Sequence, residues 1–210
     1  MASSQTLSSG SDSSGSDSGS SLRPLAIYWT ICVVVGVVYL RPEVMQFPAI
    51  VGSSHVVTVV AGLLAVVVTT VAYKRVTTFG MRSLHLPTLF GFSLANGICE
   101  TIAFFASFKV GVVIASLFTT SPLWLFTVGL TTFFAYSGAI HALFWLKILP
   151  AHLNKSPAVK NSRRVWIVGL VALSSVWSWL FFAFQDFWSV AVLHILFDMG
   201  MVYCIRYRLK

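Results

Sequence analysis

Residues 87–108 read PTLFGFSLANGICETIAFFASF, an apolar stretch whose one charged side chain is Glu100. A helix needs about 20 residues to cross the hydrocarbon core of a bilayer, so this stretch is long enough to span it. Five further apolar stretches occur in the chain, over residues 25–40, 55–73, 122–149, 165–184 and 187–205. The pattern predicts an all-α, polytopic transmembrane helix bundle of about six spans.

The composition supports a membrane protein. Of the 210 residues, 57% are hydrophobic and only 10% are charged, and the mean hydropathy is +0.84. A soluble domain carries about 25% charged residues, so this chain cannot cover a water-facing surface and we expect the lipid bilayer as its surroundings. Tryptophans near the ends of the stretches suggest an aromatic belt at the membrane interface: Trp29, Trp124, Trp145, Trp166 and Trp188.

The first residues have a different composition. Residues 1–22 are mostly Ser, Gly and Asp. Such a segment cannot bury enough apolar surface to order itself, so it is predicted to be a disordered tail. Residues 23–210 are predicted to form one integral membrane helical domain.

The basic residues decide between two topologies. With six spans, the side that holds the termini carries 12 basic residues and the other side carries 2. The larger group comprises Arg23, Lys74, Arg75, Arg82, Lys147, Lys155, Lys160, Arg163, Arg164, Arg206, Arg208 and Lys210, and the smaller one Arg41 and Lys109. The positive-inside rule then places both termini on the cytoplasmic (or stromal or matrix) side. These short basic loops show no stripe interleaved with aromatic residues, so we expect no nucleic-acid binding.

A rival topology splits residues 110–149 into two crossings and gives seven spans. The split of basic residues then becomes 4 to 10, which the positive-inside rule disfavours. With six spans, the apolar run Val110 to Thr120 is too short to cross, and we expect it to be a re-entrant or interfacial segment.

Four ionisable residues fall deep inside the predicted spans. They are Glu100, His141, His194 and Asp198. Each lies within about 10 Å of the membrane midplane at 1.5 Å per helical residue. An ionisable group at this depth costs roughly 2.5–3.5 kcal/mol on insertion scales, so we expect the four to meet in a lipid-excluded site.

The chain around these residues suits a packed site. Asn96 lies one helical turn before Glu100 and can donate a hydrogen bond to it. Gly97 allows a neighbouring helix to approach closely, and Gly138 is expected to do the same beside His141. A carboxylate beside histidines can serve as a general base, relay protons, or join helices as a buried polar pair. The sequence has no HExxH motif, so we expect neither a metal nor a cofactor.

The order of these residues resembles the CAAX-protease and bacteriocin-processing family of intramembrane proteases. That family carries an EExxxR motif, an FxxxH motif and an HxxxN or HxxxD motif on separate helices. Here His194 and Asp198 match the third motif, and His141 matches the second, with Ser137 in place of phenylalanine. The first motif keeps Glu100.

Two positions depart from the family pattern. Cys99 replaces the other glutamate of the first motif, and Phe104 replaces its arginine. The resemblance implies an endopeptidase acting on a lipidated or membrane-embedded peptide, or a diverged member that has lost catalysis. It implies that Glu100 is the base. It also implies that the groups that orient water or stabilise the oxyanion are His141, His194 and Asp198. The alternatives are a small proton- or solute-coupled transporter and a non-catalytic membrane subunit.

Overall fold

The computed structural model describes residues 22–46, 52–76, 83–141 and 157–206, and these residues form helices joined by turns, without a strand. The helices are α1 (Leu22–Tyr39), α2 (Arg41–Met45), α3 (Ser53–Val76), α4 (Leu86–Ser116), α5 (Pro122–Ile140), α8 (Pro157–Phe184) and α9 (Phe187–Ile205). The predicted tail over residues 1–22 lies outside the described residues except for Leu22, which begins α1.

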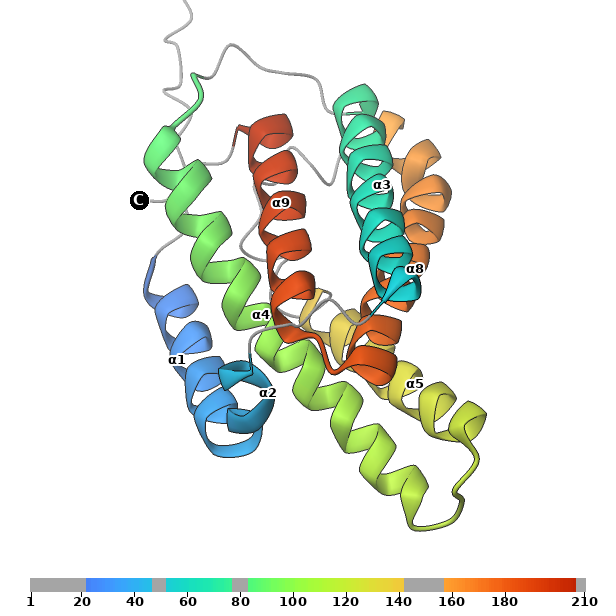
Figure 1. Ribbon diagram of the computed structural model, residues 1–210. Coiled ribbons are helices and arrows are strands. Elements are labelled where there is room, and N and C mark those ends of the chain that lie inside the picture. Colours follow the sequence, from blue (N-terminus) through green and yellow to red (C-terminus); the bar gives the residue numbers. More distant parts are fainter. Residues whose placement is uncertain (1–21, 47–51, 77–82, 142–156, 207–210) are drawn as a thin grey trace, which may run out of the picture.

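The prediction of an all-α membrane bundle is confirmed. The helices α1, α3, α4, α5 and α9 are each long and apolar enough to cross a membrane. The sixth long helix, α8, has a shorter apolar part over Val168–Phe184. Figure 1 shows these six helices running in alternating directions, as six successive crossings require.

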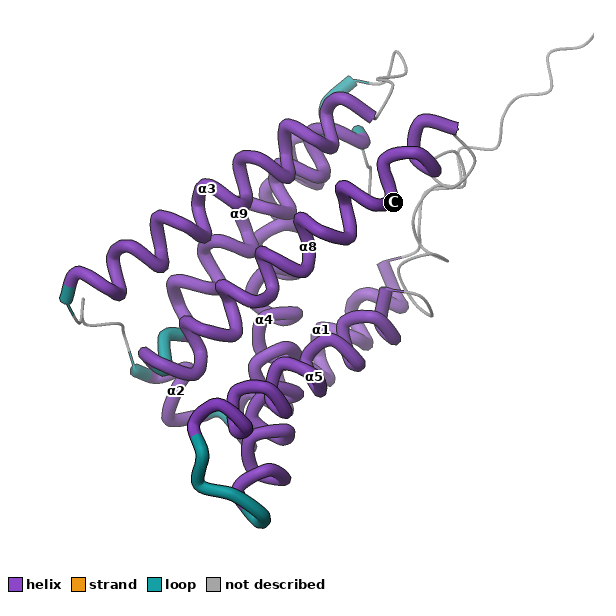
Figure 2. Tube along the Cα trace, turned by 90° about the vertical axis from the view of Figure 1, so that its right-hand side faces the viewer, coloured by secondary structure: helices purple, strands orange, loops and turns teal. Residues whose placement is uncertain are grey.

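Two groups of three helices make up the bundle (Figure 2). One group contains α1, α4 and α5, and the other contains α3, α8 and α9. Helices α4 and α9 pack directly against each other and form the main connection between the groups. The central core is rich in aromatic rings, among which Phe105 and Phe181 stack at 4.1 Å between centroids.

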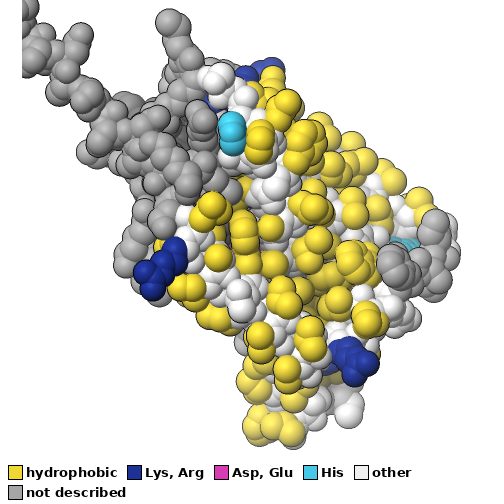
Figure 3. All heavy atoms as spheres, turned by 90° about the vertical axis from the view of Figure 1, so that its left-hand side faces the viewer, with side chains coloured by type: hydrophobic (Ala, Val, Ile, Leu, Met, Phe, Trp, Pro, Cys, Tyr) yellow, Lys and Arg dark blue, Asp and Glu magenta, His cyan; other side chains and the backbone are white. Residues whose placement is uncertain are grey.

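The outer surface is apolar over the faces that meet lipid. Figure 3 shows hydrophobic side chains over most of one face, with Lys and Arg confined to a few places. On α1 and α3 the exposed side chains include Val34, Val38, Leu64 and Val68. Because water would not solvate such a surface favourably, this exposure fits a bundle surrounded by lipid.

The segment between the third and fourth predicted spans differs from the expectation. The residues from Val110 to Ser116 continue α4 without a break, so they are neither re-entrant nor a separate interfacial helix. This finding also rules out the seven-span alternative, because a single helix, α5, follows within residues 122–141. The rest of the predicted fourth span, residues 142–149, lies outside the described residues.

Close packing of α4 on α5 explains why the helix continues. A Cβ atom added to Gly111 would lie 2.7 Å from the Val128 carbonyl oxygen and 2.9 Å from Gly129 Cα. The two glycines therefore let the backbones of α4 and α5 approach, as small residues do in membrane helix pairs. At 31 residues, α4 is about 45 Å long, and Figure 1 shows it slanting past α9.

Polar pairs hold the end of the bundle opposite the termini. Lys109 lies inside α4, not in a loop as its place in the charge count assumed, and it pairs with Glu43 of α2. At the turn between α8 and α9, Asp186 accepts a hydrogen bond from Ser189 N and lies 2.7 Å from His55 Nε2. These contacts connect α2, α3 and α4 to the rest of the bundle and hold its helices in register.

Candidate functional site

Asn96 connects the two carboxylates that the sequence predicts at membrane depth. Its amide nitrogen donates to Glu100 Oε2 and to Asp198 Oδ2, both at 2.9 Å. Its amide oxygen accepts from Trp29 Nε1 at 3.2 Å. Because carboxylates only accept and an indole N–H only donates, these partners determine which way the amide faces. The expected contact of Asn96 with Glu100 is confirmed, and α9 supplies the second acid.

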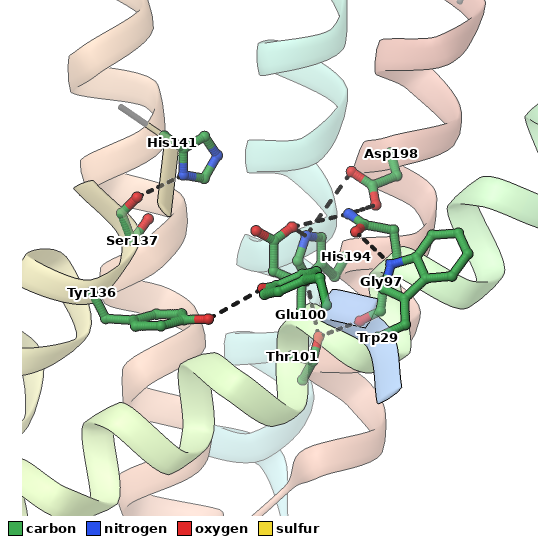
Figure 4. A network of polar contacts seen from close by, with 11 residues as sticks. Trp29, Gly97, Glu100, Thr101, Tyr136, Ser137, His141, His194 and Asp198 are labelled. Carbon is green, nitrogen blue, oxygen red and sulfur yellow. Dashed lines mark hydrogen bonds and ion pairs between the residues drawn. The ribbon is translucent and has the colours of Figure 1, made fainter. Parts of the chain in front are cut away.

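His194 stands beside the two acids. Its Nε2 lies 3.5 Å from Glu100 Oε2 and 3.9 Å from Asp198 Oδ1. Its Nδ1 lies 3.0 Å from Thr101 Oγ1. All three residues are 3% exposed, so the convergence of Glu100, His194 and Asp198 in a lipid-excluded site is confirmed (Figure 4).

The hydrogen bonds also determine the tautomer of His194. The Thr101 hydroxyl donates to the Gly97 carbonyl oxygen at 2.6 Å, so it has no hydrogen left to donate to the imidazole. Nδ1 of His194 therefore carries the proton and donates to Thr101. Nε2 then faces two carboxylates, and its lone pair would repel theirs unless a proton lies on Nε2 or on one of the acids. The arrangement thus requires a proton at this point.

Aromatic rings restrain the imidazole further. The Phe104 ring stacks on it with centroids 5.5 Å apart and an interplanar angle of 6°. Trp177 of α8 lies 4.7 Å away, at an angle of 37°. With both nitrogens engaged and two rings against it, His194 has little freedom to rotate.

Gly97 permits the contact of α4 with α9 at the site, as predicted. An added Cβ atom would lie 2.8 Å from Ile195 N and 2.9 Å from Ile195 Cα. Those are backbone atoms of the residue that follows His194, and backbone cannot move aside cheaply. The glycine therefore sets the distance between the two halves of the site.

His141 does not join the other three. It is exposed at the end of α5, and its Nδ1 bonds the Ser137 carbonyl oxygen of its own helix at 2.7 Å. Tyr136 of α5 faces inward, where its hydroxyl lies 3.2 Å from that of Tyr28 (Figure 4). Five positions correspond to about 140° of helix rotation, so His141 cannot share that face. Among the described residues, Gly138 likewise has no atom within 4 Å of an added Cβ, so these residues do not show the close approach expected there.

Three residues of the site were not predicted from the sequence. Trp29, expected only as part of an aromatic belt, donates to Asn96 within the site. Thr101 had no expected partner, although its place one turn after Gly97 allows its bond to the backbone. Trp177 comes from a helix that carries no ionisable site residue, so no pattern pointed to it.

The described residues contain no group of three or more His, Cys, Asp and Glu side chains arranged to hold a metal ion. The three cysteines, Cys32, Cys99 and Cys204, are buried and free. What the site offers chemically is a buried carboxylate fixed by an amide donor, a restrained histidine of defined tautomer, and a second acid close to both.

Known proteins give no guide to the use of these groups. No protein-family model matches the chain, and no curated protein or solved structure matches it either.

Proposed function

We propose that this integral membrane protein is a diverged relative of the CAAX-type intramembrane proteases and hydrolyses a lipidated or membrane-embedded peptide. The observation that carries the proposal is the position of Glu100. Its Oε2 accepts from Asn96 at 2.9 Å and lies 3.5 Å from His194 Nε2. An oriented carboxylate beside a restrained histidine is the arrangement that general-base hydrolysis needs.

In the proposed reaction, Glu100 takes a proton from a water molecule as the water oxygen attacks the peptide carbonyl carbon. His194, with a proton on Nε2, stabilises the oxygen that becomes negative. The C–N bond then breaks, and the proton held by Glu100 passes to the leaving nitrogen. Asn96 acts through Glu100 by holding its carboxylate in place.

In this proposal, Asp198 and Asn96 take the roles of the two groups that the family motif has and this chain lacks. Cys99 stands where a second glutamate is expected, but Asp198 of α9 brings a second carboxylate to the same amide. Phe104 stands where an arginine is expected, and its ring stacks on His194. Asn96 supplies a hydrogen-bond donor for Glu100.

The comparison of His194→Ala with His141→Ala tests the proposal. The purified protein in lipid nanodiscs is incubated with transmembrane and lipidated peptides, and the products are identified by mass spectrometry. We expect His194→Ala to lower the rate by about 10²-fold or more, the effect of losing one acid–base or electrostatic group. His141→Ala should keep the wild-type rate, because its side chain lies outside the site. No cleavage by the wild type, or the reverse order of the variants, would refute the proposal.

The proton required by His194 favours a second candidate, a proton-coupled carrier. Ionisable groups at membrane depth commonly mark proton relays, and this site holds two acids and a histidine within 4 Å contacts. In that case Asp198→Asn should abolish proton influx into protein-containing vesicles under a pH gradient, measured with an enclosed pH-sensitive dye. His141→Ala is the matched control. Wild-type vesicles no more permeable to protons than empty ones would exclude the carrier.

A further inference from the structure

Trp177 has a buried polar atom with no partner. Its side chain is 4% exposed, and its Nε1 has no hydrogen-bond partner among the described residues. An indole N–H can only donate and cannot reach the carbonyl oxygens of its own helix. The Ser93 and Ser178 hydroxyls are also unpaired, but a serine can turn to its own backbone with a small rotation. Trp177 is therefore the unpaired donor that most needs an explanation.

In two other tryptophans the inward-facing indole N–H donates a hydrogen bond to an acceptor within the protein. Trp29 Nε1 donates to Asn96 Oδ1 at 3.2 Å. Trp188 Nε1 donates to the Val44 carbonyl oxygen at 2.9 Å. Leaving a buried donor unpaired costs about 1–3 kcal/mol, and water is scarce at membrane depth. Among the inward-facing tryptophans of the described residues, Trp177 is thus the exception.

The location of Trp177 suggests what it binds. Its ring lies 4.7 Å from that of His194 and meets Phe197 edge-on at 6.4 Å. It comes from α8, whereas the acids and the histidine come from α4 and α9. A third helix therefore brings an indole ring, whose N–H is unpaired among the described residues, beside the group proposed to stabilise the reacting oxygen.

We infer that Trp177 is a substrate-binding residue whose Nε1–H donates a hydrogen bond to a backbone carbonyl oxygen of the peptide held at the Glu100–His194 site. This inference rests on the proposed function, because it assumes a peptide at that site. A carbonyl oxygen fits a neutral donor better than a carboxylate does, since the site already holds two acids. The bond would position the peptide without taking part in proton transfer.

The test uses the full chain in lipid nanodiscs, with the tryptophan indoles labelled with ¹⁵N. The probe is a transmembrane Ala/Leu peptide, and Trp177→Phe identifies the Trp177 signal. Addition of the peptide should shift the Trp177 N–H signal downfield and slow its exchange with water. Trp177→Phe should weaken peptide binding about 3- to 10-fold, the equivalent of one neutral hydrogen bond. Trp179→Phe is the matched control, because Trp179 lies on the same helix and is exposed.

The outcomes separate this inference from the proposed function. A peptide that shifts the Trp177 signal but is never cleaved supports the binding role and refutes hydrolysis. Cleavage by the wild type, with an unmoved Trp177 signal and unchanged affinity in Trp177→Phe, overturns the inference and leaves the function standing. The inference is also overturned if the Trp177 N–H exchanges with water and its signal is not shifted by any peptide, since the indole then binds only a water molecule.

Discussion

Replacing Glu100 with Gln is expected to lower peptide hydrolysis by about 10²- to 10⁴-fold, the range that general acid–base catalysis contributes. Gln has the same shape, and its amide oxygen can still accept from Asn96, so the fold should be kept. It cannot take a proton from water at neutral pH, so the base is lost. Single-turnover rates on a cleaved peptide, with binding measured separately, distinguish lost chemistry from lost affinity.

Glu43→Gln is the matched control for this prediction. Glu43 is also a buried acid, but it pairs with Lys109 at the end of the bundle away from the site. Its replacement should leave the hydrolysis rate unchanged. Equal losses in both variants would mean that the effect comes from a loosened bundle, and would remove Glu100 from its role as the base.

Replacing Asn96 with Leu is expected to destabilise the protein by about 3–5 kcal/mol. The leucine removes two hydrogen bonds to buried carboxylates, and a bond to a charged group contributes about 1.5–3 kcal/mol. The change also leaves Trp29 Nε1 without its acceptor. Thermal unfolding in detergent micelles, followed by tryptophan fluorescence or size-exclusion chromatography, measures the loss.

Two further variants make this second prediction sharper. Leu94→Ala changes an exposed residue on the same helix and should alter stability by less than about 0.5 kcal/mol. Adding Glu100→Gln and Asp198→Asn to Asn96→Leu should recover part of the stability, because the acids that lost their donor are then neutral. Fully additive losses would show that Asn96 does not act through the carboxylates.

The sequence predicts the architecture well, because lipid imposes a strong constraint on it. Apolar stretches of sufficient length mark the helices, since a membrane leaves the backbone few other ways to satisfy its hydrogen bonds. The exception is the run from Val110 to Ser116. Length alone suggests that the helix should stop near Phe108, but α4 continues to Ser116, and Gly111 and Gly129 pack it against α5. This contact between helices accompanies the continuation of α4, and hydropathy does not report such contacts.

The site was predictable where local spacing controls it. Asn96 and Glu100, and His194 and Asp198, are each four positions apart, so each pair shares one face of its helix. The inclusion of His141 rested on its depth and on its match to a short family motif. Depth gives the position of a residue along the membrane normal, but not the rotation of its helix about the helix axis. In α5 this rotation places Tyr136 on the inward face and His141 outside it.

The separation of Asn96 and Asp198 in the chain bears on how the protein is made. They stand 102 positions apart. Ribosomes add about 5–20 residues per second, so α4 exists for roughly 5–20 s before its partner acid is synthesised. During that interval Asn96 can already bond Glu100 within the nascent helix, because that contact is local. The nascent helix α4 thus provides a hydrogen bond for Glu100 before α9 is present. When α9 is added, Asp198 becomes the acceptor for the second amide hydrogen of Asn96.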